Sequence, residues 1–211
     1  MATSYAATTA VAVVAALLAA RGERRWAYGA SKAVASAGFL GVAWSVGTLF
    51  EGWTGVAFLA LALSAVGDVA LAGRGKVAFI VGLAGFMAAH AAYAVAFGRL
   101  GARPEWLALT VPLAVAVAAL AWWWLRTRVS RTLRVPVAAY IAVVSAMAAI
   151  GVAAGLSHGA ASLALGVALV AGSDAAVARH RFVAPGLGNK LVGLPAYYLG
   201  QLLIAFSLGG G

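Results

Sequence analysis

Long apolar runs, separated by short polar stretches, follow one another along the whole chain. Each run approaches the roughly 20 residues that an α-helix needs to cross the hydrocarbon of a bilayer. No stretch between the runs is long enough to separate two domains, so residues 1–211 are expected to form a single transmembrane helical domain. The pattern predicts an all-α polytopic membrane protein with eight transmembrane helices, at residues 4–20, 31–49, 53–72, 76–97, 105–125, 134–154, 158–178 and 188–208.

Composition supports this class. The chain is 64% hydrophobic and 9% charged, whereas a soluble domain carries about a quarter charged residues. The first run has no basic residue before it and RGERR (21–25) after it, which favours a retained N-terminal anchor over a cleaved signal peptide. The absence of cysteine excludes disulfides and thiol nucleophiles. The three scattered histidines predict no metal site.

The distribution of basic residues predicts the topology. The net charge of +10 would suggest nucleic-acid binding in a soluble protein, but here the bases lie in short loops between apolar runs. The first, third, fifth and seventh loops hold twelve lysines and arginines, and the other three hold only Arg99 and Arg103. By the positive-inside rule, the odd loops face the cytoplasm and contact anionic membrane lipid. We therefore expect a multi-pass cell-membrane protein with both termini outside and no nucleic-acid partner.

Two aspartates interrupt apolar runs, and they are the candidate catalytic residues. Asp68 lies six residues before Arg74, and Asp174 lies five residues before Arg179. At 1.5 Å per residue, both carboxyls lie roughly 8–9 Å inside the predicted cytoplasmic edge. An ionised acid is costly in lipid, so each should face the bundle interior with a partner. Two nearby carboxyls can share a proton, which provides an acid and a base for hydrolysis of an acid-labile C–O bond.

Other polar residues in the runs are candidates for binding substrate or positioning water. The topology places Tyr140 at a depth similar to that of the aspartates, and Lys32, Tyr197 and Tyr198 in the same cytoplasmic half. His90 and Gln201 lie deeper, at roughly 21 and 16 Å. Tyr93 shares a helical stripe with His90. Alternatively, the lysine could snorkel or pair with an aspartate, the tyrosines could belong to an interfacial belt, and the stripe could pack against a neighbour. The full candidate set is Lys32, His90, Tyr93, Tyr140, Tyr197, Tyr198 and Gln201.

Two further classes of function fit the same residues. Segments 62–72 and 168–178 align without gaps and match at their aspartates, which is consistent with a four-plus-four internal repeat. A repeat and intramembrane acids also suit a small proton-coupled secondary transporter, with the aspartates as proton carriers. A non-catalytic membrane scaffold is the third class, and it predicts that both aspartates tolerate replacement by asparagine.

Five motifs cover most of residues 60–208: LSAVGDVALA (63–72), FIVGLAGFMAAHAAYAVAF (79–97), PVAAYIAVVSAMAAIG (136–151), LGVALVAGSDAAVARHRF (165–182) and YYLGQLLIAFS (197–207). In these motifs and in their order the chain resembles the lysoplasmalogenase (YhhN-like) family. The resemblance implies an eight-helix membrane hydrolase that cleaves the vinyl ether bond of a lysophospholipid substrate, the lysoplasmalogen. The products are a fatty aldehyde and a glycerophospho head group, with no metal or organic cofactor.

The two intramembrane aspartates of that family correspond to Asp68 and Asp174. The resemblance therefore specifies the chemistry that the aspartate pair would perform, in an active site toward the cytoplasmic leaflet. On this hypothesis, Asp68→Asn and Asp174→Asn each abolish aldehyde release and leave the protein folded.

Overall fold

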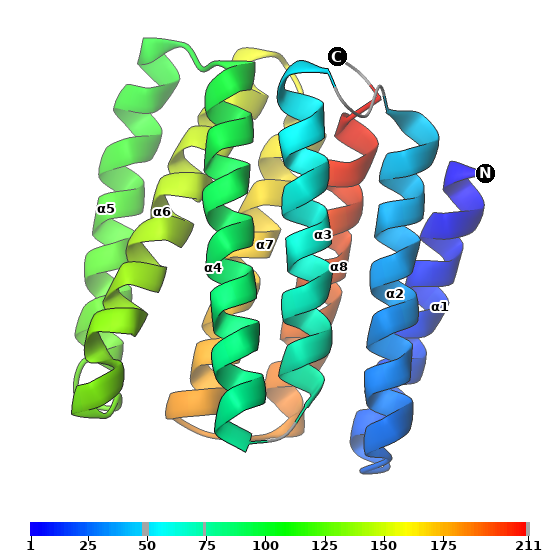
Figure 1. Ribbon diagram of the computed structural model, residues 1–211. Coiled ribbons are helices and arrows are strands. Elements are labelled where there is room, and N and C mark those ends of the chain that lie inside the picture. Colours follow the sequence, from blue (N-terminus) through cyan, green and yellow to red (C-terminus); the bar gives the residue numbers. More distant parts are fainter. Residues whose placement is uncertain (48–50, 74, 210–211) are drawn as a thin grey trace.

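The computed structural model describes residues 1–47, 51–73 and 75–209. These residues form a bundle of eight α-helices joined by short loops (Figure 1). The predicted all-α class is confirmed. Arg74 and the end of the second predicted run lie outside the described residues. The helices are α1 (Ala2–Arg21), α2 (Arg25–Val46), α3 (Gly52–Ala72), α4 (Gly75–Leu100), α5 (Pro104–Leu125), α6 (Arg134–Ser157), α7 (Ala161–Phe182) and α8 (Leu187–Ser207), and the short 3-10 helix η1 (Arg131–Leu133) precedes α6.

Most helices begin and end within a few residues of the predicted runs, and α2 differs most. It begins at Arg25, six residues before the predicted start. Residues 25–30 read RWAYGA, which is too polar to extend an apolar run but contains no proline to interrupt a helix. Hydropathy therefore marks the apolar part of a helix, and the helix itself continues into the polar zone.

The described residues contain six helices that are long and apolar enough to cross a membrane, α1, α3, α4, α5, α6 and α7. The chain is thus a polytopic membrane protein. The remaining two, α2 and α8, have similar lengths and stand within the same bundle (Figure 1). They carry more polar residues, among them Lys32 and Gln201. That these two helices also cross the membrane stays a prediction.

The odd-numbered loops lie together at one end of the bundle (Figure 1). Helix α1 begins and α8 ends at the opposite end. This arrangement agrees with the alternation of basic and non-basic loops along the sequence. Which end faces the cytoplasm stays a prediction from the positive-inside rule.

Glycines bring two helix pairs, α3–α4 and α7–α8, into backbone contact. A Cβ atom at Gly67 would lie 3.1 Å from the carbonyl oxygen of Gly82 on α4. A Cβ atom at Gly200 would lie 2.7 Å from the carbonyl oxygen of Gly166 on α7. Small residues allow this close approach in membrane bundles. Because α3 and α7 carry the two aspartates, these contacts fix the helices that hold the candidate site.

We expect Gly200→Ala to lower the free energy of unfolding by about 1–2 kcal/mol, because overpacking against α7 outweighs the better helix propensity of alanine. Gly98→Ala is the matched control, since nothing lies within 4 Å of a Cβ atom at this glycine of α4. The control should be neutral or stabilising by up to about 1 kcal/mol. Thermal unfolding of both purified variants in detergent measures the difference, and equal midpoints would contradict the proposed α7–α8 contact.

Candidate functional site

Asp68 on α3 is held by residues of two other helices. Its Oδ1 atom lies 2.9 Å from the ammonium nitrogen of Lys32 on α2. Its Oδ2 atom accepts hydrogen bonds from Ser36, at 3.2 Å, and from Tyr198 on α8. Lys32 and Ser36 are four residues apart and therefore share one face of α2. The side chains of Lys32 and Asp68 are only 5% and 4% exposed, so this is a buried ion pair with both carboxylate oxygens occupied.

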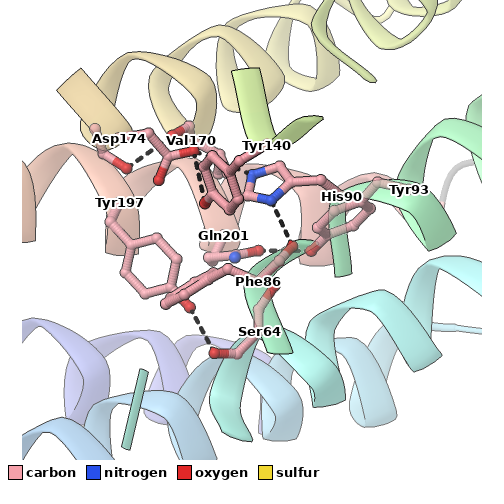
Figure 2. A network of polar contacts seen from close by, with 10 residues as sticks. Ser64, Phe86, His90, Tyr93, Tyr140, Val170, Asp174, Tyr197 and Gln201 are labelled. Atoms are coloured by element: carbon pink, nitrogen blue, oxygen red, sulfur yellow. Dashed lines mark hydrogen bonds and ion pairs between the residues drawn. The ribbon is translucent and has the colours of Figure 1, made fainter. Parts of the chain in front are cut away.

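Asp174 on α7 has a different set of partners (Figure 2). Tyr140 on α6 donates a hydrogen bond of 3.2 Å to its Oδ2 atom. The same oxygen lies 3.4 Å from Nε2 of His90 on α4. The side chain of Asp174 is 19% exposed, and that of His90 is 1% exposed. Asp174 is therefore the more accessible of the two aspartates, and neither lysine nor arginine pairs with it among the described residues.

The contacts of His90 identify the place of a proton. Its Nδ1 atom lies 2.6 Å from the backbone carbonyl oxygen of Phe86. A carbonyl only accepts, so Nδ1 carries a hydrogen. In the neutral ring Nε2 then has none, and it finds no hydrogen-bond partner among the described residues. A single proton between Nε2 and Asp174 would complete the contact, either as imidazolium with carboxylate or as imidazole with carboxylic acid. The Asp174–His90 pair is therefore suited to hold and release one proton.

A third polar contact lies near the Asp174 cluster (Figure 2). Tyr93 on α4 donates a hydrogen bond of 2.6 Å to Oε1 of Gln201 on α8. The amide nitrogen of Gln201 is buried and has no hydrogen-bond partner within the described part of the chain. Tyr197 donates to the backbone carbonyl oxygen of Ser64 at 3.3 Å, and its ring packs edge-on against Phe86, with 5.6 Å between centroids.

Both aspartates line one polar cavity of about 520 Å³ at the end of the bundle where the odd loops gather. Tyr197 lies in the wall of this cavity as well. Among the described residues, five lysines and arginines line it, and Glu23 is the third acid of its lining beside the two aspartates. The basic lining residues are Arg24, Arg25, Lys32, Arg181 and Lys190. Such a cavity favours an anionic ligand, since its walls concentrate positive potential.

A second, apolar cavity of about 760 Å³ lies among α4, α5, α6 and α7. Its walls are mainly alanine, valine, leucine and aromatic side chains, and Tyr140 lies among them. The polar and apolar cavities share part of their walls. The shared lining residues are Leu71, Phe79, Phe86, Asp174, Val177 and Arg181. Asp174 is thus the aspartate that faces both cavities, and Asp68 faces only the polar one.

The structure places six of the seven predicted binding residues in three groups, and the seventh, Tyr197, lies in the wall of the polar cavity. Lys32 and Tyr198 surround Asp68. His90 and Tyr140 surround Asp174. Tyr93 and Gln201 contact each other, and neither lines the polar or the apolar cavity. The sequence had left open that Lys32 pairs with an aspartate instead of serving only to bind substrate. The structure shows this ion pair, between Lys32 and Asp68.

Sequence reasoning missed several residues around Asp68 and the two cavities. Ser36 follows Lys32 by one helical turn, so its spacing was the available signal. Tyr28 precedes Lys32 by one turn, and its ring centroid lies 5.5 Å from the ammonium of Lys32 and 4.7 Å from that of Lys190. Arg181 lies over the ring of Phe79, at 4.1 Å from the centroid. No sequence signal pairs residues so far apart in the chain.

No group of three or more histidine, cysteine, aspartate or glutamate side chains that could hold a metal ion lies within the described residues. The site therefore offers carboxyl, imidazole, phenol and ammonium groups, which can move protons and bind anions.

Comparison with known proteins identifies the family of the chain. A protein named lysoplasmalogenase TMEM86B from Sus scrofa is 34% identical to the chain over 149 residues, which are 71% of this chain and 61% of that protein. The chain thus matches less than two thirds of that relative's length. No solved structure matches the chain. Residues 27–208, which include both aspartates and their partners, match the model of the YhhN family. The chain therefore belongs to the YhhN family.

Proposed function

We propose that the chain is a membrane-embedded hydrolase that cleaves the vinyl ether bond of lysoplasmalogens. The substrates are lysoplasmenyl-ethanolamine or lysoplasmenyl-choline, and the products are a fatty aldehyde and the glycerophospho head group. The observation that carries the proposal is that Asp68 and Asp174 line one cavity with a basic rim. Membership of the YhhN family and the name of the Sus scrofa relative support the same reaction.

The Asp174–His90 pair supplies the proton. Vinyl ethers hydrolyse when the alkene carbon farther from oxygen is protonated, and Asp174 is the acid exposed toward both cavities. The carboxyl proton passes to this carbon, and a new C–H bond replaces the π bond. The positive charge then rests on the ether oxygen and its neighbouring carbon as an oxocarbenium ion, which the Asp174 carboxylate stabilises. Paired acids in glycoside hydrolysis act on a similar ion.

Water completes the reaction and restores the acid. The water oxygen bonds to the oxocarbenium carbon, and one water proton returns to the Asp174–His90 pair. The resulting hemiacetal collapses: the pair protonates the glycerol oxygen as the C–O bond breaks, and it takes back the proton of the hemiacetal hydroxyl. One water is consumed, and the pair ends with the proton with which it began. Tyr140 fixes the carboxyl throughout by its hydrogen bond.

Asp68 serves the reaction in another role. Both of its oxygens are occupied by Lys32, Ser36 and Tyr198, so it acts as the partner of Lys32 and does not pass protons to the substrate. It balances the buried ammonium of Lys32 and directs that ammonium at the wall of the polar cavity. An ammonium has three N–H donors, and those not used by Asp68 are free to bind a phosphate oxygen.

The test is direct incubation of the purified protein with lysoplasmenyl-ethanolamine and lysoplasmenyl-choline, with aldehyde measured by mass spectrometry. The matched 1-acyl and 1-O-alkyl lysophospholipids are controls, because neither has an alkene to protonate. In D₂O the aldehyde should carry one deuterium on the carbon next to the carbonyl, since that carbon receives the proton. Absence of aldehyde, together with proton-coupled uptake into proteoliposomes, would overturn the proposal in favour of a transporter.

A further inference from the structure

The two cavities have opposite chemistry and meet at Asp174. The polar cavity is rimmed by arginine and lysine, and the apolar cavity is lined by aliphatic and aromatic side chains. Their volumes, about 520 and 760 Å³, are those of sites that enclose small molecules. Asp174 and Arg181 are the charged residues common to both walls. A ligand that fills both must have one polar end and one apolar end.

The apolar cavity opens toward the lipid beside α5. Helix α5 packs mainly against α6 and stands at the edge of the bundle (Figure 1). Among its residues only Thr110 and Leu125 are buried. Leu113, Leu120 and Trp123 line the cavity and are at the same time largely exposed. A hydrocarbon chain can therefore reach the cavity sideways from the bilayer without crossing water.

We infer that a single-chain phospholipid lies across the two cavities, with its hydrocarbon chain in the apolar cavity among α4–α7 and its phosphate in the basic cavity. The bond between chain and head then lies beside Asp174. This inference deepens the proposed function and rests on it for the identity of that bond. It adds the place where the hydrocarbon chain of the lipid is held. It also assigns to the apolar cavity the selection of lipids by the length of that hydrocarbon chain.

Charge complementarity supports the orientation. Lys32 reaches the polar cavity from its ion pair with Asp68, and Lys190 reaches it beside the ring of Tyr28. Arg181 lies at the junction, over the ring of Phe79. Cations around a pocket bind a phosphate, whereas a buried hydrocarbon chain requires the apolar walls. The reverse orientation would bury a phosphate among aliphatic side chains, which is strongly unfavourable.

The depth of Ala148 makes it the residue to change. It lines the apolar cavity on α6, eight residues after Tyr140, the residue of the same helix that donates a hydrogen bond to Asp174. Eight residues of one helix span roughly 12 Å. A side chain enlarged at Ala148 therefore narrows a part of the cavity that is well away from the reacting bond.

The experiment compares Ala148→Phe with Ala146→Phe. Ala146 is on the same helix two residues earlier, is exposed, and lines neither cavity. For each variant kcat/KM is measured with hexadecenyl and octenyl lysoplasmenyl-choline. We expect Ala148→Phe to lower the long-chain to short-chain ratio by about tenfold or more, because the pocket can no longer hold the far methylenes. Ala146→Phe should keep the wild-type ratio.

The ratio is taken within one variant, so partial loss of folded protein does not change it. An unchanged ratio in Ala148→Phe would overturn the assignment of the chain to this cavity. An equal change in Ala146→Phe would overturn it as well, because bulk on the lipid face would then have the same effect.

A binding probe separates this inference from the proposed reaction. The probe is 1-O-alkyl lysophosphatidylcholine with a diazirine at the end of its chain, which has no alkene to protonate. We expect cross-links at Ala149 and Val152, which line the same cavity beyond Ala148, and their loss in Ala148→Phe. Cross-links spread over exposed faces of the bundle would overturn the inference. Cross-links at this cavity without aldehyde from any lipid would support it and overturn the reaction.

Discussion

The Asp174→Asn variant should lose aldehyde release by about 100- to 10,000-fold in kcat, which is the range for removal of a general acid. Asparagine has nearly the shape of aspartate and can still accept the hydrogen bond of Tyr140. It cannot hold the proton that the Asp174–His90 contact requires. We therefore expect a folded protein that binds lipid and does not cleave it. Single-turnover measurement of aldehyde, with thermal unfolding of the same sample, tests both parts.

Glu105→Gln is the matched control for Asp174→Asn. Glu105 is an exposed acid at the start of α5, where it lies 3.8 Å from Arg103, and it lines neither cavity. Its replacement removes one negative charge and should leave turnover unchanged. Turnover near the wild-type rate in Asp174→Asn would exclude Asp174 as the proton donor.

The Asp68→Asn variant should instead fail mainly in stability, by about 3–5 kcal/mol, because it leaves the buried ammonium of Lys32 without a counter-charge. Replacing Lys32 by methionine in the same protein removes that unpaired charge. The double variant Lys32→Met, Asp68→Asn should therefore recover most of the lost stability. Thermal unfolding of the wild type, the single variants Lys32→Met and Asp68→Asn, and the double variant forms a complete mutant cycle.

The double variant also separates the roles of the two aspartates. Without Lys32 the polar cavity loses one phosphate donor, so KM should rise while the proton transfer at Asp174 persists. A double variant that is stable and has lost kcat as completely as Asp174→Asn would show that Asp68 takes part in the proton transfer itself. Additive destabilisation by the two substitutions would contradict the ion pair.

The sequence predicted the helices well because an apolar run of bilayer length has few other stable conformations. It also predicted that Asp68 and Asp174 each have a partner within the bundle, since an acid within such a run needs one. It treated the two as equivalent, however, and the structure separates them. Asp68 forms an ion pair with Lys32, whereas the carboxyl of Asp174 contacts the imidazole of His90. That difference depends on which helices are neighbours, and hydropathy carries no information on this.

The predicted depth of His90 shows the limit of counting along helices. The sequence placed His90 roughly 12 Å deeper than Asp174, yet their side chains lie 3.4 Å apart. Side chains lean toward the N-terminus of their own helix. Helices α4 and α7 run in opposite directions, so His90 leans toward the end with the odd loops and Asp174 leans away from it. The cavities arise from tertiary packing, so they lay beyond sequence reasoning.

The position of Asp174 in both walls has a consequence for product release. A bond cut at the boundary of the two cavities yields one fragment soluble in lipid and one soluble in water. The aldehyde would leave past α5 into the bilayer, and the glycerophospho fragment would leave past the basic rim into solution. Once the fragments occupy different phases they no longer meet at the carboxyl, so their recombination is suppressed without any moving lid.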